Sequence, residues 1–591
     1  MSLKGLYKPL LLGLAIRELL APWTGHPFDF EIWVRLGAYI QTGASPYSIL
    51  PYYQGISFAP YSVMTSISYP PLSALIFGAI FDLYRTLGSP SGFLYYFLLK
   101  QPLVISDLLI SVLLFRLISL KGETGRARKV AILWIFLPFT IIVSSMWGAL
   151  DPLALFLILA SVYALETERP MLSAGLLGLS IYLKLMPIIF LPLFLFRPIP
   201  MTKRVAFAAV SLGIPAVGTL APFLSLGWSF SGIFNAVSYQ GALPTFGGIS
   251  LFNALSLFVT RGSLLTQGLG WAWLPVLLAF YAFAFYKKIG LIESLLVTIL
   301  LFSIFRSVVP EQWALYPIAF LLLTYDGRSL TRVWAIAGIA TAFLLVNNVL
   351  LVRFFSPVSA AAFSWDLFVD NVSLFSVFRY ALLFIISTLF VAESFSIILR
   401  RNSFILSKLE ALRRIRPREL LVPLAYLAVV SVSGGLLDFA ATSMITNWAL
   451  AIQSNVFLGM SWLSLYHIML VAVFEILVVL VVVFSRRNLS ESIGLFLLLT
   501  FLNFVASSLS LVLYRSLEGA PVFATTTIYL ANSALVTERA FVVFAATLGA
   551  LGIFYLGEIR AFFLIALRRT TKTGDNPRRE ELIADSLPAV A

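Results

Sequence analysis

Long uninterrupted apolar segments dominate this sequence, and most are close to the length that a helix needs to cross a bilayer. Crossing the roughly 30 Å hydrocarbon core takes about 20 helical residues, whereas barrel strands are shorter and alternate apolar with polar positions. The pattern therefore predicts an all-α integral membrane protein, a multi-spanning bundle of about 14 to 16 transmembrane helices. The predicted segments lie near residues 9–22, 93–120, 129–147, 151–166, 171–184, 186–197, 204–226, 271–286, 291–308, 312–325, 332–352, 377–399, 421–441, 461–484, 490–514 and 537–566.

Composition supports this prediction and limits the chemistry available. Of the 591 residues, 60% are hydrophobic and 12% are charged, with a mean hydropathy of +0.96. An ordinary soluble domain, in which about half of the residues are apolar and about a quarter are charged, is excluded. The lack of cysteine excludes disulfides, thiolate metal sites and cysteine nucleophiles. With histidine only at His26 and His467, no histidine cluster is available for zinc or haem.

The distribution of basic residues predicts how the helices are oriented. Short cytoplasmic loops of membrane proteins collect Lys and Arg. Every basic loop and the C-terminal tail fall on one side if residues 70–87 are left out of the count of crossings. We therefore expect cytoplasmic termini and an external loop 23–69, in which Arg35 is the one base. The formal charge of +14 then reflects orientation and requires no nucleic-acid partner.

Two juxtamembrane helices are predicted in the first external loop, residues 23–92. Residues 70–87 are expected to lie in or dip into the outer interface, in a helix that the Pro70-Pro71 pair starts. A second, amphipathic helix is expected to begin at Asp29 and to stop before Gly43. Its apolar positions at helical spacing are Ile32, Trp33, Leu36, Tyr39 and Ile40.

Asp29 and Glu31, at the start of this amphipathic helix, allow both a structural and a catalytic interpretation. Asp29 can be the N-cap and Glu31 a first-turn acid that the helix dipole favours. A carboxylate at the mouth of a membrane cavity can also act as a base, because burial raises its pKa. A divalent metal could bind both acids on extended backbone but is not favoured on a helix, where residues two apart face different directions. His26 is interpreted as a surface residue.

A series of short motifs resembles the GT-C superfamily of membrane glycosyltransferases. The likeness covers about residues 1–400 and points to the branch of the α-mannosyltransferases and glycosylphosphatidylinositol mannosyltransferases. Ala149 stands where that branch often has Gln, and the acidic pair is Asp-x-Glu instead of Asp-x-Asp. The motifs, in order, are Asp29-x-Glu31, Ser45-Pro46-Tyr47, Tyr69-Pro70-Pro71-Leu72, Lys100-x-Pro102 with Asp107, Trp147-Gly148-x-x-Asp151, and Lys184-x-x-Pro187.

The resemblance implies an inverting transfer of a hexose, mannose by family likeness, from a polyprenyl (dolichyl) phosphate to a lipid-linked glycan or lipid head group. No cofactor is implied, and the chain lacks the glycine-rich phosphate loop of nucleotide-binding proteins. Because the leaving phosphate is already a stable anion, such chemistry needs one carboxylate base and several cations. The candidate catalytic residues are Asp29, Glu31 and Asp151; the candidate donor-phosphate ligands are Arg35, Lys100, Lys184 and Arg306; the candidate substrate-binding residues are Tyr47, Tyr69, Trp147, Glu311 and Gln312.

Each of these candidates also has an ordinary structural interpretation. Asp151 can cap the helix 151–166, because Pro152 follows at the favoured first position. Trp147 can be an interfacial anchor, and Lys184 can extend its ammonium to the membrane surface. Glu311 can be a first-turn acid in the helix that follows Pro310.

The expected organisation has four parts. The catalytic region spans residues 1–400 and is followed by a basic cytoplasmic linker at 400–420. Residues 421–570 form an unrecognised four-helix module with an unknown partner, and residues 571–591 form a cytoplasmic tail. We expect a plasma membrane protein, or an endoplasmic reticulum protein in a eukaryote, with its active site on the extracytoplasmic face. The alternatives are a transporter or lipid flippase, against which the lack of an internal repeat argues, and a noncatalytic subunit on the same scaffold.

Overall fold

The computed structural model describes residues 5–48, 50–59, 67, 69–234, 247–255, 270–324, 330–348, 350–359 and 372–400. The chain divides into two compact units. The first consists of Met1–Ser256 with Arg261–Lys408, and the second of Leu257–Thr260 with Leu409–Ala591. The expected basic linker beyond residue 400, the four-helix module and the tail lie outside the described residues.

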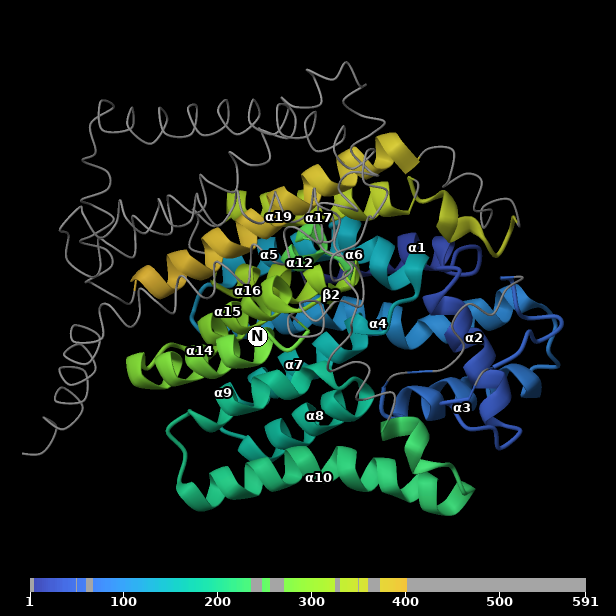
Figure 1. Cartoon of the computed structure of the whole chain (residues 1–591), viewed down its shortest axis with the longest axis horizontal. Helices are drawn as coiled ribbons and strands as arrows, with labels where there is room; N and C mark the ends of the chain where they lie inside the picture. Colours follow the sequence, from blue (N-terminus) through green and yellow to red (C-terminus); the bar gives the residue numbers. More distant parts are fainter. Residues whose placement is uncertain are drawn as a thin grey trace, which may run out of the picture. The chain divides into compact units, whose positions relative to one another are not determined.

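The first unit is built from helices, as Figure 1 shows, with one two-residue parallel strand pair among the described residues. Every segment predicted before residue 400 contains a helix, and the two helices predicted within residues 23–92 are present as α2 and α3. The elements are α1 (Tyr7–Leu20), α2 (Asp29–Ile40), α3 (Leu72–Thr86), α4 (Gly92–Ser119), α5 (Thr124–Phe136), α6 (Pro138–Ile141), η1 (Ile142–Trp147), α7 (Asp151–Glu166), α8 (Pro170–Leu183), η2 (Met186–Phe190), α9 (Leu191–Leu195), α10 (Met201–Leu226), β1 (Gly247–Gly248), α12 (Leu251–Leu255), α14 (Trp273–Lys287), α15 (Leu291–Phe305), β2 (Val308–Val309), η3 (Glu311–Ala314), α16 (Leu315–Thr324), α17 (Leu330–Asn347), η4 (Val352–Phe355) and α19 (Val372–Arg400).

Two of the described helices, α4 and α10, are each long and apolar enough to cross a membrane. The bent pair Thr124–Phe136 and Pro138–Trp147 raises this number to three if it forms one span, and further apolar helices are shorter. These lengths fit an all-α membrane protein, while the number of about sixteen crossings stays a prediction.

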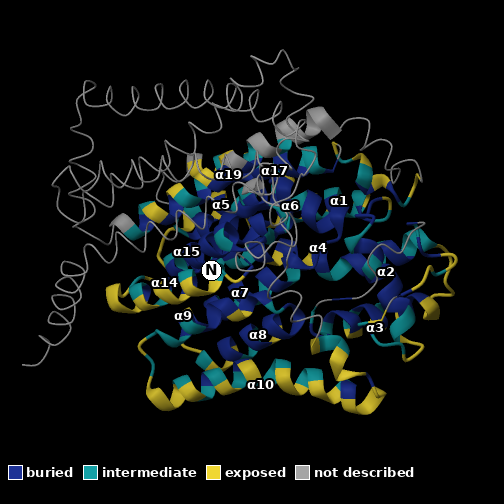
Figure 2. Cartoon of the chain, viewed as in Figure 1, coloured by how far each residue is buried: buried dark blue, intermediate teal, exposed yellow. Residues whose placement is uncertain are grey.

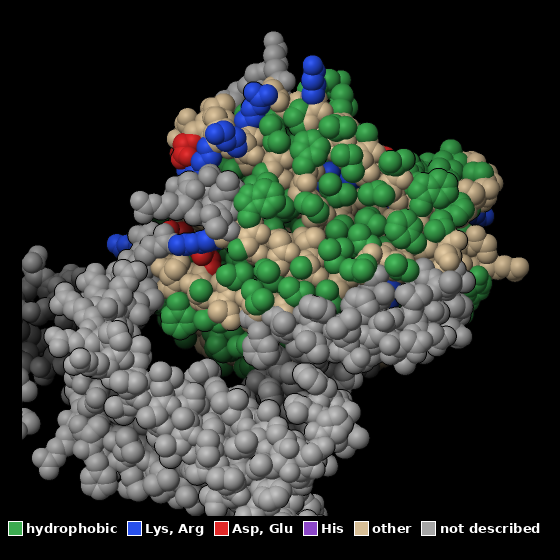
Figure 3. All heavy atoms as spheres, turned by 90° about the horizontal axis from the view of Figure 1, so that it is seen from above, with side chains coloured by type: hydrophobic (Ala, Val, Ile, Leu, Met, Phe, Trp, Pro, Cys, Tyr) green, Lys and Arg blue, Asp and Glu red, His purple; other side chains and the backbone are tan. Residues whose placement is uncertain are grey.

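The helices of the first unit differ in how deeply they are buried, as Figure 2 shows. Almost all of the described side chains of α15 and α16 are buried, whereas α10 buries only Phe207, Ser211 and Phe223. Figure 3 shows one face of the unit, where hydrophobic side chains cover most of the described surface and Lys and Arg gather toward one end. An apolar surface of this kind is suited to contact with lipid.

The predicted segment 129–147 is helical, but its helix is broken at Leu137. Leu137 has φ −66° and ψ 121°, the extended backbone that a following proline favours. Pro138 then begins α6, which continues into the π-helix η1. The helix axis bends by 51° between Thr124–Phe136 and Pro138–Trp147. The break turns the chain toward Trp147, where η1 ends.

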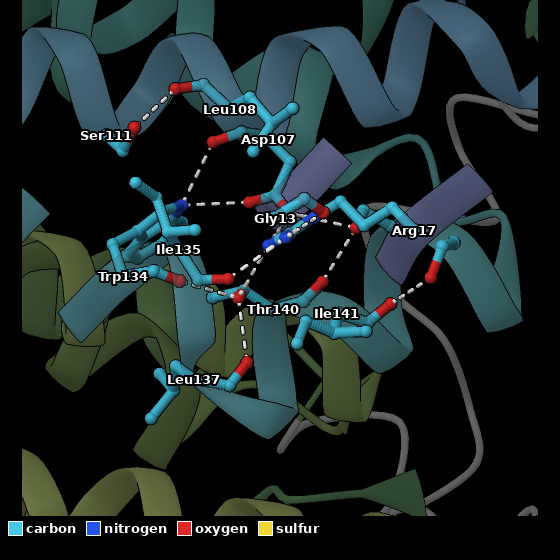
Figure 4. A network of polar contacts seen from close by, with 12 residues as sticks. Gly13, Arg17, Asp107, Leu108, Ser111, Trp134, Ile135, Leu137, Thr140 and Ile141 are labelled. Atoms are coloured by element: carbon cyan, nitrogen blue, oxygen red, sulfur yellow. Dashed lines mark hydrogen bonds and ion pairs between the residues drawn. The ribbon is translucent and has the colours of Figure 1, made fainter. Parts of the chain in front are cut away.

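A buried ion pair and its partners lie at this break (Figure 4). Arg17 of α1 donates from Nε to Asp107 Oδ2 of α4 at 2.8 Å, and neither side chain is exposed. Trp134 Nε1 donates to Asp107 Oδ1, also at 2.8 Å, while Arg17 donates to Thr140 Oγ1 and Ser144 to Asp107. Because the loss of either charge would leave the other buried without a partner, this contact is costly to break. The network therefore holds α1, α4 and η1 in place relative to one another.

Candidate active site

The predicted helix at Asp29 is present as α2, but Asp29 is not its cap. The N-cap residue is Phe28, whose side chain accepts no hydrogen bond from the backbone N–H groups of the first turn. His26 accepts hydrogen bonds at the start of the helix instead. Its Nδ1 accepts from the backbone N–H of Asp29 at 3.2 Å and from that of Phe28 at 3.4 Å. The capping interpretation of Asp29 is therefore wrong, and its carboxylate is available for another contact.

That contact is with Trp147. Its indole Nε1 donates to Asp29 Oδ2 at 2.9 Å, and the Asp29 side chain remains 41% exposed. Trp147 itself is 2% exposed, which contradicts its interpretation as an interfacial anchor. A partly exposed carboxylate with one oxygen held by a buried donor has its other oxygen available to accept a proton.

The chain turn after Trp147 places the tryptophan beside His26. Gly148 has φ +76°, and a Cβ there would lie 2.4 Å from Phe30 Cδ2, so glycine is required for two reasons. The rings of His26 and Trp147 stack with centroids 4.5 Å apart at 13°, and the His26 backbone N–H donates to the Trp147 carbonyl at 3.1 Å. His26 is buried, which corrects its interpretation as a surface residue.

Glu31 and Arg35 have a separate set of partners. Arg35 Nε donates to Glu31 Oε1 at 2.6 Å, and the Phe58 N–H donates to Glu31 Oε2 at 3.2 Å. The other Arg35 nitrogens donate to the Leu50 and Ala59 carbonyls. Burial raises the pKa of Glu31, although Arg35 opposes the rise. The pair thus holds the external loop onto α2.

The arrangement of Asp29 and Glu31 does not fit a shared metal ion. Both acids lie on one helix two residues apart, and their carboxylates have different partners, Trp147 for Asp29 and Arg35 with Phe58 for Glu31. Within the described ranges, no group of three or more His, Cys, Asp or Glu residues is placed to hold a metal.

Asp151 and Lys184 form a buried ion pair, which contradicts both of their structural interpretations. Lys184 Nζ lies 2.6 Å from Asp151 Oδ1, and the side chains are 2% and 1% exposed. Tyr316 donates its hydroxyl to the same carboxylate oxygen at 3.0 Å. Asp151 does not cap α7, and Lys184 does not extend to the membrane surface.

The Lys184 ammonium and the Arg306 guanidinium share the ring of Trp313. Lys184 Nζ lies 5.3 Å and Arg306 Cζ 5.1 Å from the Trp313 ring centroid. Lys184 also lies 5.5 Å from the Tyr69 ring centroid. Burial raises the pKa of Tyr69, the charges of Asp151 and Asp29 raise it further, and Arg306 opposes them. Tyr69 therefore lies within electrostatic reach of both acids and of Arg306.

Glu311 lies within electrostatic reach of Asp29. Burial raises the pKa of Glu311; the Arg379 and Arg353 charges oppose the rise, and the Asp29 charge adds to it. Asn347 donates its amide to the Glu311 carboxyl. Glu311, one of the candidate substrate-binding residues, is thus a second acid within electrostatic reach of Asp29.

The remaining predicted residues lie around this group or outside it. Tyr47 donates its hydroxyl to the Tyr69 carbonyl at 3.0 Å and so supports Tyr69. Gln312 is buried, and its side-chain oxygen has no partner among the described residues. Lys100, like Arg35, uses its donors elsewhere, on Thr24 and on backbone carbonyls.

Known proteins share sequence with this chain. The profile of Glycosyltransferase family 87 matches residues 68–305. GPI mannosyltransferase 1 from Candida albicans (strain SC5314 / ATCC MYA-2876) is 26% identical over 319 residues, which cover 50% of this chain and 76% of that protein. Over these ranges the chain is similar to glycosyltransferases of the GT-C superfamily.

The range of the family match and the structural site overlap only in part. The matched range holds Tyr69, Trp147 and the Asp151–Lys184 pair, whereas Asp29 and Glu311 lie outside it. Sequence reasoning missed His26, Trp313 and Tyr316 as members of the group. Trp313 directly follows the candidate residues Glu311 and Gln312, and this was the signal in the sequence that could have found it.

His26 predicts an acid sensitivity of this protein. Burial lowers the pKa of His26 from 6.5 to about 4, so the unfolded chain gains a proton between these values and the folded chain does not. Stability is therefore lost as the pH falls from about 6.5 to about 4, by roughly 3 kcal/mol at about 1.4 kcal/mol per pH unit. Thermal unfolding in detergent should show that His26→Asn loses less stability than wild type when the pH is lowered over this range. The asparagine side chain can still accept a hydrogen bond from the start of the helix. Equal losses in both proteins would contradict this.

Proposed function

We propose that this protein transfers a hexose, mannose by its similarity to GPI mannosyltransferase 1, from a polyprenyl phosphate to a lipid-linked acceptor on the external membrane face. The observation that carries the proposal is the place of Asp29. Its partly exposed carboxylate accepts a hydrogen bond from Trp147. Its charge affects the pKa of Tyr69, as do the charges of Asp151 and Arg306. Tyr69 is thus influenced by the charges of the acid Asp29 and of the buried cation Arg306 together.

The reaction needs a base and a stabilised leaving group. The acceptor hydroxyl oxygen attacks the anomeric carbon, its proton passes to Asp29, and the bond from that carbon to the phosphate oxygen breaks. Both electrons of that bond leave with the polyprenyl phosphate. Attack opposite the leaving group inverts the anomeric configuration. Because the departing phosphate is a stable anion, no strong general acid is required.

The proposed phosphate contacts are Arg306, Lys184 and Trp313. The two cations lie on one indole ring, and the Trp313 Nε1–H has no hydrogen-bond partner among the described residues although Trp313 is only 4% exposed. A buried N–H without a partner carries a cost that a phosphate oxygen would remove. Asp151 holds Lys184 in place at 2.6 Å. Arg35 and Lys100 are not part of this proposed set.

The proposed acceptor side is formed by Glu311 and Gln312. Both are buried, and Glu311 contributes to the same electrostatic environment as Asp29. A carboxyl whose pKa is raised and an amide oxygen with no partner among the described residues can bind sugar hydroxyls. Their position near the base supports an acceptor whose hydroxyl reaches Asp29.

A donor comparison tests the proposed function. The full-length protein in nanodiscs is supplied with native lipid extract and with radiolabelled polyprenyl-phosphate-mannose, polyprenyl-phosphate-glucose or GDP-mannose. We expect label to enter a lipid product from the polyprenyl-phosphate-mannose alone. Product from GDP-mannose alone would overturn the proposed donor class. If no donor yields product while reconstituted vesicles translocate the labelled lipid, the flippase alternative holds instead.

Trp147→Phe should lower the turnover number about tenfold while it changes the KM for the donor little. Phenylalanine keeps an aromatic ring against His26 but removes the N–H that holds Asp29 Oδ2 at 2.9 Å. A hydrogen bond to a charged group contributes roughly 1.5–3 kcal/mol, enough for that loss. Steady-state kinetics with the labelled donor measure it.

The matched control for this variant is Trp334→Phe, because Trp334 on α17 is 49% exposed. The control should keep wild-type kinetics. An unchanged turnover number in Trp147→Phe would show that the indole does not hold the base.

A further inference from the structure

Lys100 of α4 is a fully buried cation, and backbone oxygens surround its ammonium group. Nζ donates to the Thr24 carbonyl, to Ser145 O at 2.7 Å and to Ala21 O at 3.0 Å. Thr24 Oγ1 at 3.2 Å and Met146 O at 3.4 Å complete the group. An ammonium has three N–H donors, so these oxygens leave none for a phosphate.

Three of the five oxygens around Lys100 belong to the ends of two helical segments, and the two of Thr24 follow the first segment closely in the chain. Ala21 is the C-cap of α1, and residues 145 and 146 lie in the last turn of η1. The last carbonyls of a helix lack partners within it and carry partial negative charge. A buried ammonium satisfies these carbonyls from both segments at once, so Lys100 joins the end of α1 to the end of η1.

The two joined ends lead directly to the partners of Asp29. Thr24 precedes His26 by two residues, and Met146 precedes Trp147. His26 accepts from the Asp29 N–H through Nδ1, and Trp147 donates to the Asp29 carboxylate. The backbone N–H of His26 donates to the Trp147 carbonyl at 3.1 Å, so the segment after α1 and the end of η1 are hydrogen-bonded to each other.

We propose that Lys100 is a positioning residue for the base Asp29 and that it does not bind the donor phosphate. It holds the ends of α1 and η1 together, and those ends fix His26 and Trp147, which in turn orient Asp29. This inference rests on the proposed function, in which Asp29 takes the proton of the acceptor. Small displacements of a catalytic group by distant changes can lower a rate about a hundredfold.

The kinetic test compares Lys100→Met with Lys121→Met, which removes an exposed lysine from a loop. We expect Lys100→Met to lower the turnover number about 10- to 100-fold with a donor KM within about twofold of wild type. In the Trp147→Phe background, the same change should lower the turnover number by no more than about threefold, because both act through Asp29. A tenfold rise in the donor KM with turnover retained, or losses that multiply in the double variant, would overturn the proposal.

Thr24→Val gives a second, milder disturbance that leaves the buried charge in place. It removes the hydroxyl that accepts from Lys100 and donates to the Leu20 carbonyl at 2.7 Å. We expect a several-fold loss of turnover with an unchanged donor KM, a result that decides the matter if Lys100→Met does not fold. Wild-type turnover in Thr24→Val would count against the proposal.

Hydrogen exchange separates this inference from the proposed function, because it needs no activity. In Lys100→Met, amide exchange should rise over residues 21–29 and 143–149 and stay unchanged in Lys121→Met. If wild type transfers no sugar but this deprotection occurs, the proposed function fails and the role of Lys100 as a link between the two ends stands. If exchange does not change while wild type is active, the inference fails and the proposed function stands.

Discussion

Asp29→Asn should lower sugar transfer by about a thousandfold, the middle of the range for loss of a general base. The amide oxygen of asparagine can still accept from Trp147 Nε1, so the geometry around residue 29 is retained. What is lost is a group that accepts the proton of the acceptor hydroxyl. Initial rates with labelled polyprenyl-phosphate-mannose and native lipid extract measure the effect.

The control for Asp29→Asn is Asp82→Asn, the same change at an exposed residue of α3. The control variant should transfer sugar at the wild-type rate, and both variants should unfold at the wild-type temperature in detergent. Transfer that survives Asp29→Asn would move the base elsewhere, with Glu311 the next acid to examine because it contributes to the same electrostatic environment.

Lys184→Met should destabilise the protein by about 3–5 kcal/mol as well as reduce transfer, because it leaves Asp151 buried without its cation. The two groups lie 2.6 Å apart, and both side chains are almost fully buried. Thermal unfolding in detergent measures the loss, and Lys203→Met, at an exposed position on α10, is the matched control.

Lys184→Met combined with Asp151→Asn separates the structural role of Lys184 from its role at the phosphate. Removal of both charges should restore most of the lost stability, since no uncompensated charge remains. Transfer should remain low if Lys184 contributes to phosphate binding. A double variant with both stability and transfer restored would show that the pair is structural only, and unchanged unfolding in Lys184→Met would contradict the importance of the pair altogether.

The positions of the helices followed from the sequence well, because apolar length and turn residues are local properties. The helix from Asp29 and the helix after Pro71 are where the pattern placed them. The break at Leu137 was not predicted, since the segment 129–147 is mostly apolar and its division depends on the single residue Pro138.

The candidate site was predicted less completely, because charged residues near an outer turn look alike in a sequence. Arg35 and Lys184 were given the same role, yet one is bound to Glu31 on its own helix and the other to Asp151. Capping was the plausible interpretation of Asp29 and Asp151, and in each case a distant side chain binds the carboxylate instead.

The sequence by itself determined that this is a helical membrane protein without thiol chemistry, and that few of its residues are acidic. These properties depend on composition and on residues close together in the chain. Only the tertiary structure decided which of the charged groups meet. Tyr316 reaches Asp151 across 165 residues, and Trp147 reaches Asp29 across 118. Contacts of that range depend on how helices pack, and the periodicity of a single segment carries no information about them.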